Sequence, residues 1–248
     1  MRFPCRINYP FSLLLLLCSV FILRAQPAEL EIQLHHLVGQ DTLQLDSGSY
    51  QNPLNQDFTL SKFRYYLSSI SLIGTDEGTF QAKEHHLIDE NNPSSKSLNF
   101  QMIPSGDYHS LLFTIGVDSV LNCSGVQSGP LDPIHGMFWT WNTGYIFMKV
   151  EGNSPVSDAP NNLIEYHIGG YNNPNNALRT ITLSFSTPLQ VSSGKSYHID
   201  LTADLLKLFQ GKHMVDFSTL PVITDPQHSA LIADNYQYLF TLSVLHEK

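Results

Sequence analysis

The chain has 248 residues, of which 42% are hydrophobic, so it is long enough to bury a substantial core. Its formal net charge of -9, from 13 Lys and Arg against 22 Asp and Glu, argues against binding to nucleic acids or anionic membranes, because both need a basic surface. The 11% aromatic content argues against intrinsic disorder. The unusual count is 11 His beside 3 Cys, which raises the question of whether any histidine has a chemical role.

Residues 1–25 have the layout of a secretory signal peptide. Arg2 and Arg6 give a positive start, an apolar run follows from Phe11 to Leu23, and a small residue, Ala25, marks cleavage near Ala25–Gln26. The run is shorter than the roughly 20 residues that a membrane-spanning helix needs. We therefore expect export to the periplasm, the extracellular space or the cell surface, with no stable membrane insertion after cleavage.

Cleavage would change the cysteine count and leave the histidines intact. Cys5 and Cys18 would be removed, which leaves Cys123 as the single cysteine of the mature chain. No motif marks Cys123 as a nucleophile, so a structural or semi-buried thiol is the favoured interpretation. All 11 His remain in the exported product.

Apolar residues recur at every second position along most of the mature chain. Runs of this kind, rich in β-branched and aromatic side chains, predict half-buried strands, and clusters of Gly, Pro and Asn separate them as turns require. The pattern is typical of a β-sandwich or a closed barrel. We predict an all-β fold, an antiparallel β-sandwich with Greek-key-like connections. The residues expected to share a face in each strand are Leu30, Ile32, Leu34 and His36; Phe63, Tyr65 and Leu67; Leu98, Phe100 and Met102; Leu111, Phe113, Ile115 and Val117; Tyr145, Phe147 and Lys149; Ile181, Leu183 and Phe185; Tyr197, Ile199 and Leu201; and Tyr238, Phe240, Leu242 and Val244.

One or two short helices are expected to interrupt the strands. The segment Thr202–Gln210 has apolar residues at helical spacing and Gly211 as a C-cap. Thr224-Asp225-Pro226 has the form of an N-cap followed by Pro in the first turn, and predicts a helix over Gln227–Asp234. No internal repeat or long linker divides the chain, so residues 26–248 are expected to form a single domain.

The sequence lacks the motifs of common enzymes. It contains no G-x-S-x-G elbow, no Walker loop, no G-x-G-x-x-G and no H-E-x-x-H. A hydrolase built on an acid–His pair would have to be assembled from arbitrary choices among the histidines. We therefore expect a protein that is not an enzyme, and metal binding is the better-motivated chemistry.

Two histidines and two tryptophans are the candidate metal-site residues. His36 continues the inward face of its predicted strand, and His167 ends a strand before a glycine turn. Trp139 and Trp141 share a face in the segment Gly136–Tyr145. Each has an ordinary alternative: a lone His on an apolar face is more often a satisfied core residue, and paired Trp side chains more often fill a core. An aromatic and thioether wall beside imidazole would suit Cu(I).

Several segments, taken in order, resemble the MbnP-like family of exported copper-binding domains. They are His36–Gly39, Phe63–Ser68, Phe113–Ser119, Gly129–Pro133, Gly136–Tyr145, Tyr166–Gly170 and Ile232–Tyr236. The resemblance implies an exported β-sandwich that binds copper, Cu(I) in particular, without catalytic turnover. In relatives a tryptophan is converted to kynurenine by a diheme cytochrome c peroxidase-like partner. Carried onto this chain, the resemblance implies Trp139 or Trp141 as the modified residue, with His36 and His167 as imidazole ligands.

A rival interpretation keeps the sandwich and removes the metal. Loops such as Tyr171–Asn176 are rich in Asn and Tyr, which suits polar recognition of a glycan or a protein. A metal-free surface binding module is therefore the alternative function.

Overall fold

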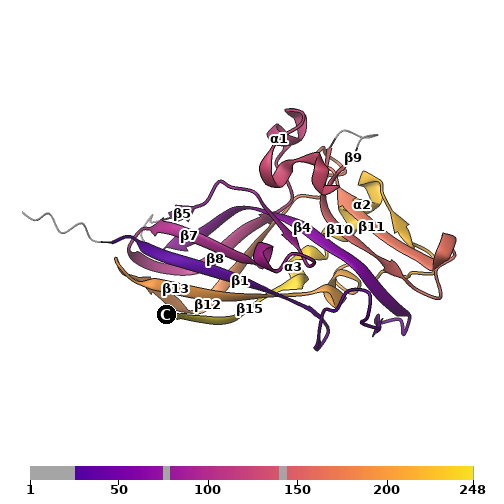
Figure 1. Ribbon diagram of the computed structural model, residues 1–248, viewed down its shortest axis with the longest axis horizontal. Coiled ribbons are helices and arrows are strands. Elements are labelled where there is room, and N and C mark those ends of the chain that lie inside the picture. The colour runs from indigo at the N-terminus through magenta and orange to yellow at the C-terminus, as the bar shows by residue number, and fades with distance from the viewer. Residues whose placement is uncertain (1–25, 75–78, 140–143, 248) are drawn as a thin grey trace, which may run out of the picture.

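The computed structural model describes residues 26–74, 79–139 and 144–247, so the predicted signal peptide and Trp141 lie outside the described residues. Most of these residues lie in strands, and the helices are short (Figure 1). The strands are β1 (Ala28–Val38), β2 (Asp41–Thr42), β3 (Tyr50–Gln51), β4 (Asp57–Gly74), β5 (Thr79–Gln81), β6 (His86–Asp89), β7 (Ser97–Ile103), β8 (Gly106–Ile115), β9 (Phe138–Trp139), β10 (Gly144–Asn153), β11 (Leu163–Gly169), β12 (Arg179–Val191), β13 (Ser196–Asp204), β14 (Val222–Ile223) and β15 (Phe240–Glu247). The helices are α1 (Ser119–Cys123), α2 (Pro226–Ala233) and α3 (Tyr236–Leu239), with 3-10 turns η1 (Pro93–Lys96), η2 (Gly129–Leu131), η3 (Pro133–His135), η4 (Pro160–Asn162) and η5 (Leu205–Leu208).

The described strands form two sheets, which confirms the predicted β-sandwich. The smaller sheet has the order β15-β13-β1-β2, with β7 also paired to β1. The larger has the order β12-β8-β4-β10-β11-β14, with β3, β5 and β6 along β4 and β9 along β10. Most neighbours are not consecutive in sequence. The pairs β1–β13 and β11–β14 run parallel, whereas the sequence pattern predicted antiparallel pairing throughout; alternation sets the face of each residue and leaves strand direction open.

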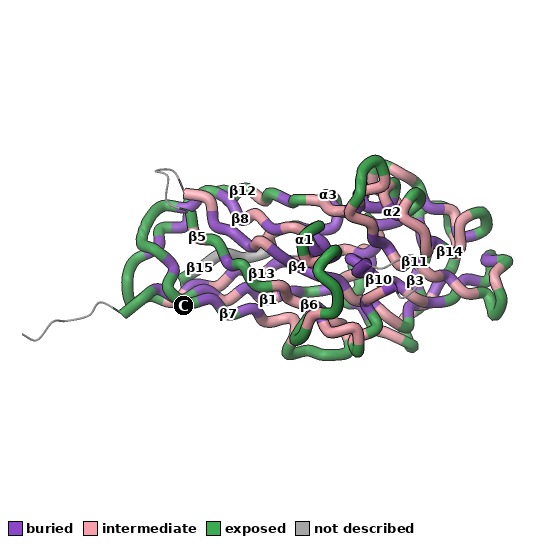
Figure 2. The backbone as a smooth tube through the Cα atoms, turned by 90° about the horizontal axis from the view of Figure 1, so that it is seen from above, coloured by how far each residue is buried: buried purple, intermediate pink, exposed green. Residues whose placement is uncertain are grey.

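The core lies between the two sheets and follows the alternation in the sequence. In β1 the residues Leu30, Ile32 and Leu34 are buried, and the residues between them are partly or fully solvent-accessible. β4 runs along much of the length of the molecule and contributes Phe63 and Tyr65 to the same cluster of buried residues. Figure 2 shows the buried segments running through the middle of the molecule, with exposed residues concentrated in the connecting loops.

One predicted helix is wrong and another is confirmed. Thr202–Gln210 was expected to be α-helical, but β13 continues through Asp204 because its backbone pairs with β1, and only η5 follows. Gly211 is not a helix cap; a Cβ there would lie 2.6 Å from the Asn235 side chain, so close packing accounts for the glycine. α2 begins as predicted, with Asp225 Oδ1 accepting hydrogen bonds from the backbone N–H groups of residues 227 and 228.

The last predicted strand begins two residues later than expected. Tyr238 belongs to α3 and its side chain is exposed, and β15 starts at Phe240. Tyr238 and Phe240 are two positions apart, as strand residues on one face would be, but one lies in a helix and the other begins a strand.

Gly152 should be required by the close approach of β4 and β10. A Cβ on Gly152 would lie 2.0 Å from the Thr59 carbonyl oxygen, and backbone in a central strand cannot move away cheaply. We predict that Gly152→Ala lowers the free energy of unfolding by about 1–3 kcal/mol or more, as overpacking does. Urea denaturation with an unchanged m-value would measure this loss.

Gly106→Ala is the matched control, because nothing lies within 4 Å of a Cβ at that position in β8. Its effect should stay within about 0.5 kcal/mol. Equal losses in the two variants would show that the contact with Thr59 is not the cause.

Candidate metal centre

His36 is a core residue whose two ring nitrogens are both engaged. Its Nδ1 lies 2.5 Å from Glu90 Oε2, and its Nε2 lies 2.8 Å from the Tyr65 hydroxyl. The ring also packs edge-on against Phe63, with centroids 4.8 Å apart. The predicted inward orientation is confirmed, since the residue is 3% exposed. These contacts account for a histidine at this position without a metal ion.

Charge around His36 is balanced by a third group. Lys96 Nζ donates to both carboxylate oxygens of Glu90, at 2.9 and 3.0 Å. Burial lowers the pKa of His36, although Glu90 acts in the opposite direction. Burial would raise the pKa of Glu90, but its hydrogen bonds to His36 and Lys96 hold that pKa below its usual range. The network is therefore a neutral imidazole beside a carboxylate–ammonium pair.

His36 and His167 lie on opposite faces of the larger sheet. Tyr65 of β4 pairs with Met148 of β10, which pairs with Ile168 of β11, and all three are buried. Residues directly opposite in a ladder share a face, and neighbours along a strand do not. His167 precedes Ile168, so its side chain leaves the outer face, whereas His36 contacts Tyr65 on the core face. The structure does not bring these two predicted ligands together.

His167 instead lies between two carboxylates on the outer face of β10 and β11. Its Nε2 is 2.9 Å from Glu151 Oε1, and its Nδ1 is 3.8 Å from Glu165 Oε1. All three side chains are partly exposed. Within the described ranges, this is the group of three or more His, Cys, Asp or Glu side chains whose ligand atoms lie within 4.8 Å of one another.

Lysines hold Glu151 in place from the other side. Lys62 Nζ donates to Glu151 Oε2 at 2.7 Å, and Lys149 Nζ lies 3.8 Å from Oε1. The hydrogen bond to His167 is the largest influence on Glu151 and, with Lys62, lowers its pKa to about 2. Burial lowers the pKa of Lys149. Glu151 is therefore ionised at any physiological pH and presents one oxygen to His167.

Trp139 lies on the same face, further along β11. A Cβ built on Gly169 would be 3.0 Å from two atoms of the six-membered ring of Trp139, so that ring covers Gly169 directly. His167 and Gly169 are two residues apart in one strand, and their side-chain positions therefore share a face. Trp139 is itself buried. The indole thus lies over Gly169, two residues along β11 from His167, where a β-bulge interrupts the register of β10 against β11.

Two basic residues bind the turn at His135 and Gly136, which precedes Trp139 in the chain. Arg64 Nη1 donates to the His135 carbonyl at 2.9 Å, and Lys149 Nζ donates to the Gly136 carbonyl. Gly136 has φ 67°, a left-handed conformation that glycine adopts without strain. The chain then enters β9, where Trp139 pairs with Gly144 of β10. The polar outer face of β4 and β10 is thus the support on which the aromatic segment lies.

The two glutamates were missed from the sequence. Glu165 is separated from His167 by one residue, which is the spacing that places two side chains on one face of a strand. That signal was available. Glu151 comes from the neighbouring strand, and only the register of β10 against β11 places it opposite Glu165.

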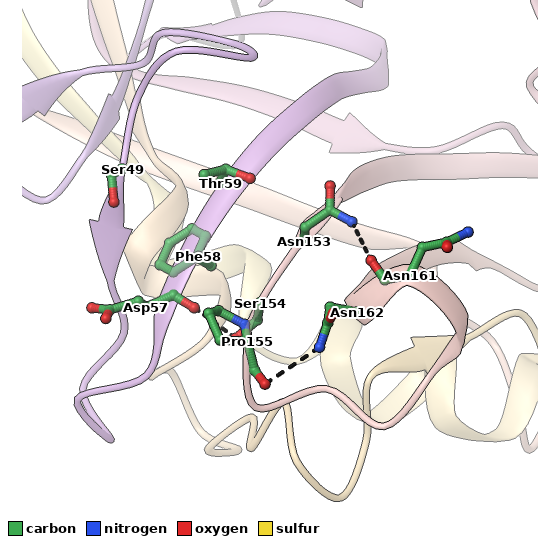
Figure 3. Close-up of a pocket in the computed structure, with 9 residues that line it drawn as sticks. All are labelled: Ser49, Asp57, Phe58, Thr59, Asn153, Ser154, Pro155, Asn161 and Asn162. Atoms are coloured by element: carbon green, nitrogen blue, oxygen red, sulfur yellow. Dashed lines mark hydrogen bonds between the residues drawn. The ribbon is translucent and has the colours of Figure 1, made fainter.

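Two other features of the sequence have clear positions. Cys123 is a free and exposed thiol, so the expectation of a semi-buried one is wrong. An asparagine-rich pocket of about 400 Å³ lies at the far end of the larger sheet, between the start of β4 and the loop after β10 (Figure 3). Asn153 and Asn162 donate to loop carbonyls there, and Asn161 and Asn162 adopt left-handed turns. Turn geometry therefore explains these asparagines.

Comparisons with known proteins identify the family of the chain. The sequence model of the MbnP family matches residues 27–225. The chain belongs to the MbnP family. The solved structure of MbnP from Methylosinus trichosporium is similar to it, with a TM-score of 0.51 and 15% identity over 81% of each chain. No curated protein matches the sequence significantly.

Membership in the MbnP family confirms the resemblance seen in the sequence, and the solved MbnP structure supports the fold. The matched residues include His36, Trp139, Glu151, Glu165 and His167. Within the described part of the chain, no helix has both the length and the apolar character needed to cross a membrane.

His36 should make stability depend on pH. Because its pKa is lowered in the folded protein from the ordinary value of 6.5, the unfolded chain binds a proton first as pH falls. The free energy of unfolding should therefore decrease as pH drops below about 6.5. His36→Gln should lose part of this slope, and it should cost about 1–3 kcal/mol by leaving buried partners unsatisfied.

The measurement is chemical denaturation at intervals between pH 5 and 8 for both proteins. His109, whose side chain is exposed and contacts Ser110, provides the control substitution. Identical pH slopes for the wild type and His36→Gln would contradict the assignment.

Proposed function

We propose that this protein is an exported copper-binding protein of the MbnP family that stores, senses or passes on copper. The observation that carries the proposal is the position of His167, which lies between two carboxylates on the sheet face that Trp139 also covers. Copper is the cargo in this proposal, and no catalytic turnover is required. The layout of residues 1–25 supports export to the periplasm or the cell surface.

The donor set fits copper through its imidazole. His167 is the nitrogen ligand, and Glu151 and Glu165 supply oxygen atoms within reach of the same ion. Carboxylate oxygens suit Cu(II) better than Cu(I), which prefers imidazole and sulfur ligands. Cu(I) would therefore favour the end of the site nearer Trp139. His36 belongs to the core network on the other face and is not part of this copper site.

A modified tryptophan would provide a ligand better suited to Cu(I) than the two carboxylates are. Opening an indole ring to kynurenine unmasks an aniline nitrogen, and Trp139 lies along the face of β11 that holds His167. Trp141, outside the described residues, follows two positions later and stays an equal candidate. A diheme cytochrome c peroxidase-like partner is the proposed agent of the modification.

The electrostatics support a binding protein over a hydrolase. General-acid chemistry at neutral pH needs a carboxyl group with a raised pKa. Among the described residues, every carboxyl group with a resolved shift has a lowered pKa, including Glu90, Glu151 and Asp200. The alternative function, a metal-free module for a glycan or a protein, predicts no role for His167.

Removal of His167 should weaken copper retention. We predict that His167→Ala weakens copper binding at least tenfold, because the set loses its imidazole and keeps two carboxylates, of which Glu151 is already paired with lysines. The measurement is competition with a chromophoric chelator, for Cu(I) under reducing conditions and for Cu(II) in air. His109→Ala and His36→Gln should retain wild-type affinity.

Wild-type copper affinity in His167→Ala would refute this site. Failure of the purified protein to hold either oxidation state would favour the metal-free alternative.

Co-expression with the diheme partner should alter one tryptophan. Intact mass should then show the gain of one oxygen and the loss of one carbon, and Trp139→Phe and Trp141→Phe should identify which residue reacts. Fragmentation of the wild-type protein provides the independent assignment. An unchanged mass, with copper still bound, would remove kynurenine from the proposal and leave the His167 site standing.

A further inference from the structure

The carboxylates of the His167 centre are balanced by ammonium groups before any ion binds. Glu151 and Glu165 carry two negative charges, and Lys62 and Lys149 carry two positive charges beside Glu151. One ammonium lies at each oxygen of Glu151, because Lys62 Nζ is 2.7 Å from Oε2 and Lys149 Nζ is 3.8 Å from Oε1. An incoming cation therefore meets two carboxylates whose charge is already offset by close neighbours.

The pairing of β4 with β10 builds this balance into the sheet. Its register sets Lys62 opposite Glu151 and Arg64 opposite Lys149. Arg64 has a carboxylate of its own, since its Nε lies 2.9 Å from Asp89 Oδ2. The guanidinium and its partner thus add one charge of each sign and leave the balance unchanged.

The two ammonium groups stay close to any ion that Glu151 binds. Lys149 is buried and its Nζ donates to the Gly136 carbonyl, which holds it in place. An ion bonded to Glu151 Oε1 at about 2.1 Å would lie within about 6 Å of Lys149 Nζ. That distance is shorter than the Debye length of about 8 Å at physiological salt, so the repulsion is only partly screened.

We propose, on the basis of the copper site proposed above, that Lys62 and Lys149 make the His167 centre selective by ion charge. The centre takes a monovalent ion, Cu(I), in preference to divalent ions such as Cu(II) and Zn²⁺. Coulomb repulsion is proportional to the charge of the ion, so the lysines oppose a divalent ion twice as strongly as a monovalent one. Carboxylate ligands alone favour the opposite order. The lysines are therefore specificity-determining residues that act without bonding to the ion.

Lys62 is the residue to substitute, because Lys149 also supports the backbone before Trp139. Lys62→Met keeps the aliphatic stem and removes the charge, and Lys62→Arg keeps the charge. The measurement is competitive binding of Cu(I) under reducing conditions, with Ag⁺ and Zn²⁺ as ions that need no reductant. Because the repulsion doubles with ion charge, Lys62→Met should tighten Zn²⁺ binding by the square of the factor for Cu(I) and Ag⁺, about tenfold against about threefold. Lys62→Arg should retain the wild-type affinities.

Lys195→Met is the matched control. Lys195 Nζ lies 2.6 Å from Glu247 Oε1, a Lys–Glu pair beside the smaller sheet, and its loss should leave every affinity unchanged. All ions are measured on one preparation of each variant, so a partly unfolded fraction lowers every stoichiometry and leaves the ratio of affinities interpretable.

Equal factors for monovalent and divalent ions, unchanged affinities, or weaker binding of both in Lys62→Met would overturn the selectivity and leave the copper site standing. Absence of copper binding in the wild type and in Lys62→Met alike would overturn the proposed function, and the selectivity with it.

Discussion

The register of β4, β10 and β11 is the constraint on which the candidate copper centre depends. It aligns Tyr65, Met148 and Ile168 on one face and their neighbours on the other. The first face contacts His36 and fills the core; the second, outer face carries Lys149, which is buried, and His167, which is partly exposed. A slip of one residue would exchange these faces. Burial of the aromatic core therefore also determines which histidine can bind an ion from solution. The register alone keeps His36 and His167 on opposite faces.

Part of this arrangement could be predicted from the sequence. Alternation identified the strand of His36 and its inward direction, and the Asp225 cap identified α2, because both signals depend on residues close in the chain. The pairing of Glu151 with His167 depends on register, and the parallel pairing of β1 with β13 depends on topology. Neither the register nor the topology can be predicted from residues that are close together in the sequence. The failed helix at Thr202–Gln210 has the same cause: pairing with β1 keeps the segment extended through Asp204, so only the 3-10 turn η5 (Leu205–Leu208) follows.

The same dependence explains why abundance of histidine was a poor guide. His36 is satisfied by Glu90 and Tyr65, so its burial reflects packing and hydrogen bonding. His167 and His198 are less buried, and each lies between two carboxylates. A neutral imidazole can donate to only one of them. The informative property is therefore a surplus of acceptors around a ring, which only side chains from neighbouring strands can create.

Lysines already supply positive charge at the His167 centre. At His167, Lys62 and Lys149 lie beside Glu151, so an incoming ion must compete with ammonium groups that are held by the sheet. The His167 centre thus depends on a ligand that favours copper strongly enough to outweigh the lysines, a role that a modified tryptophan can fill.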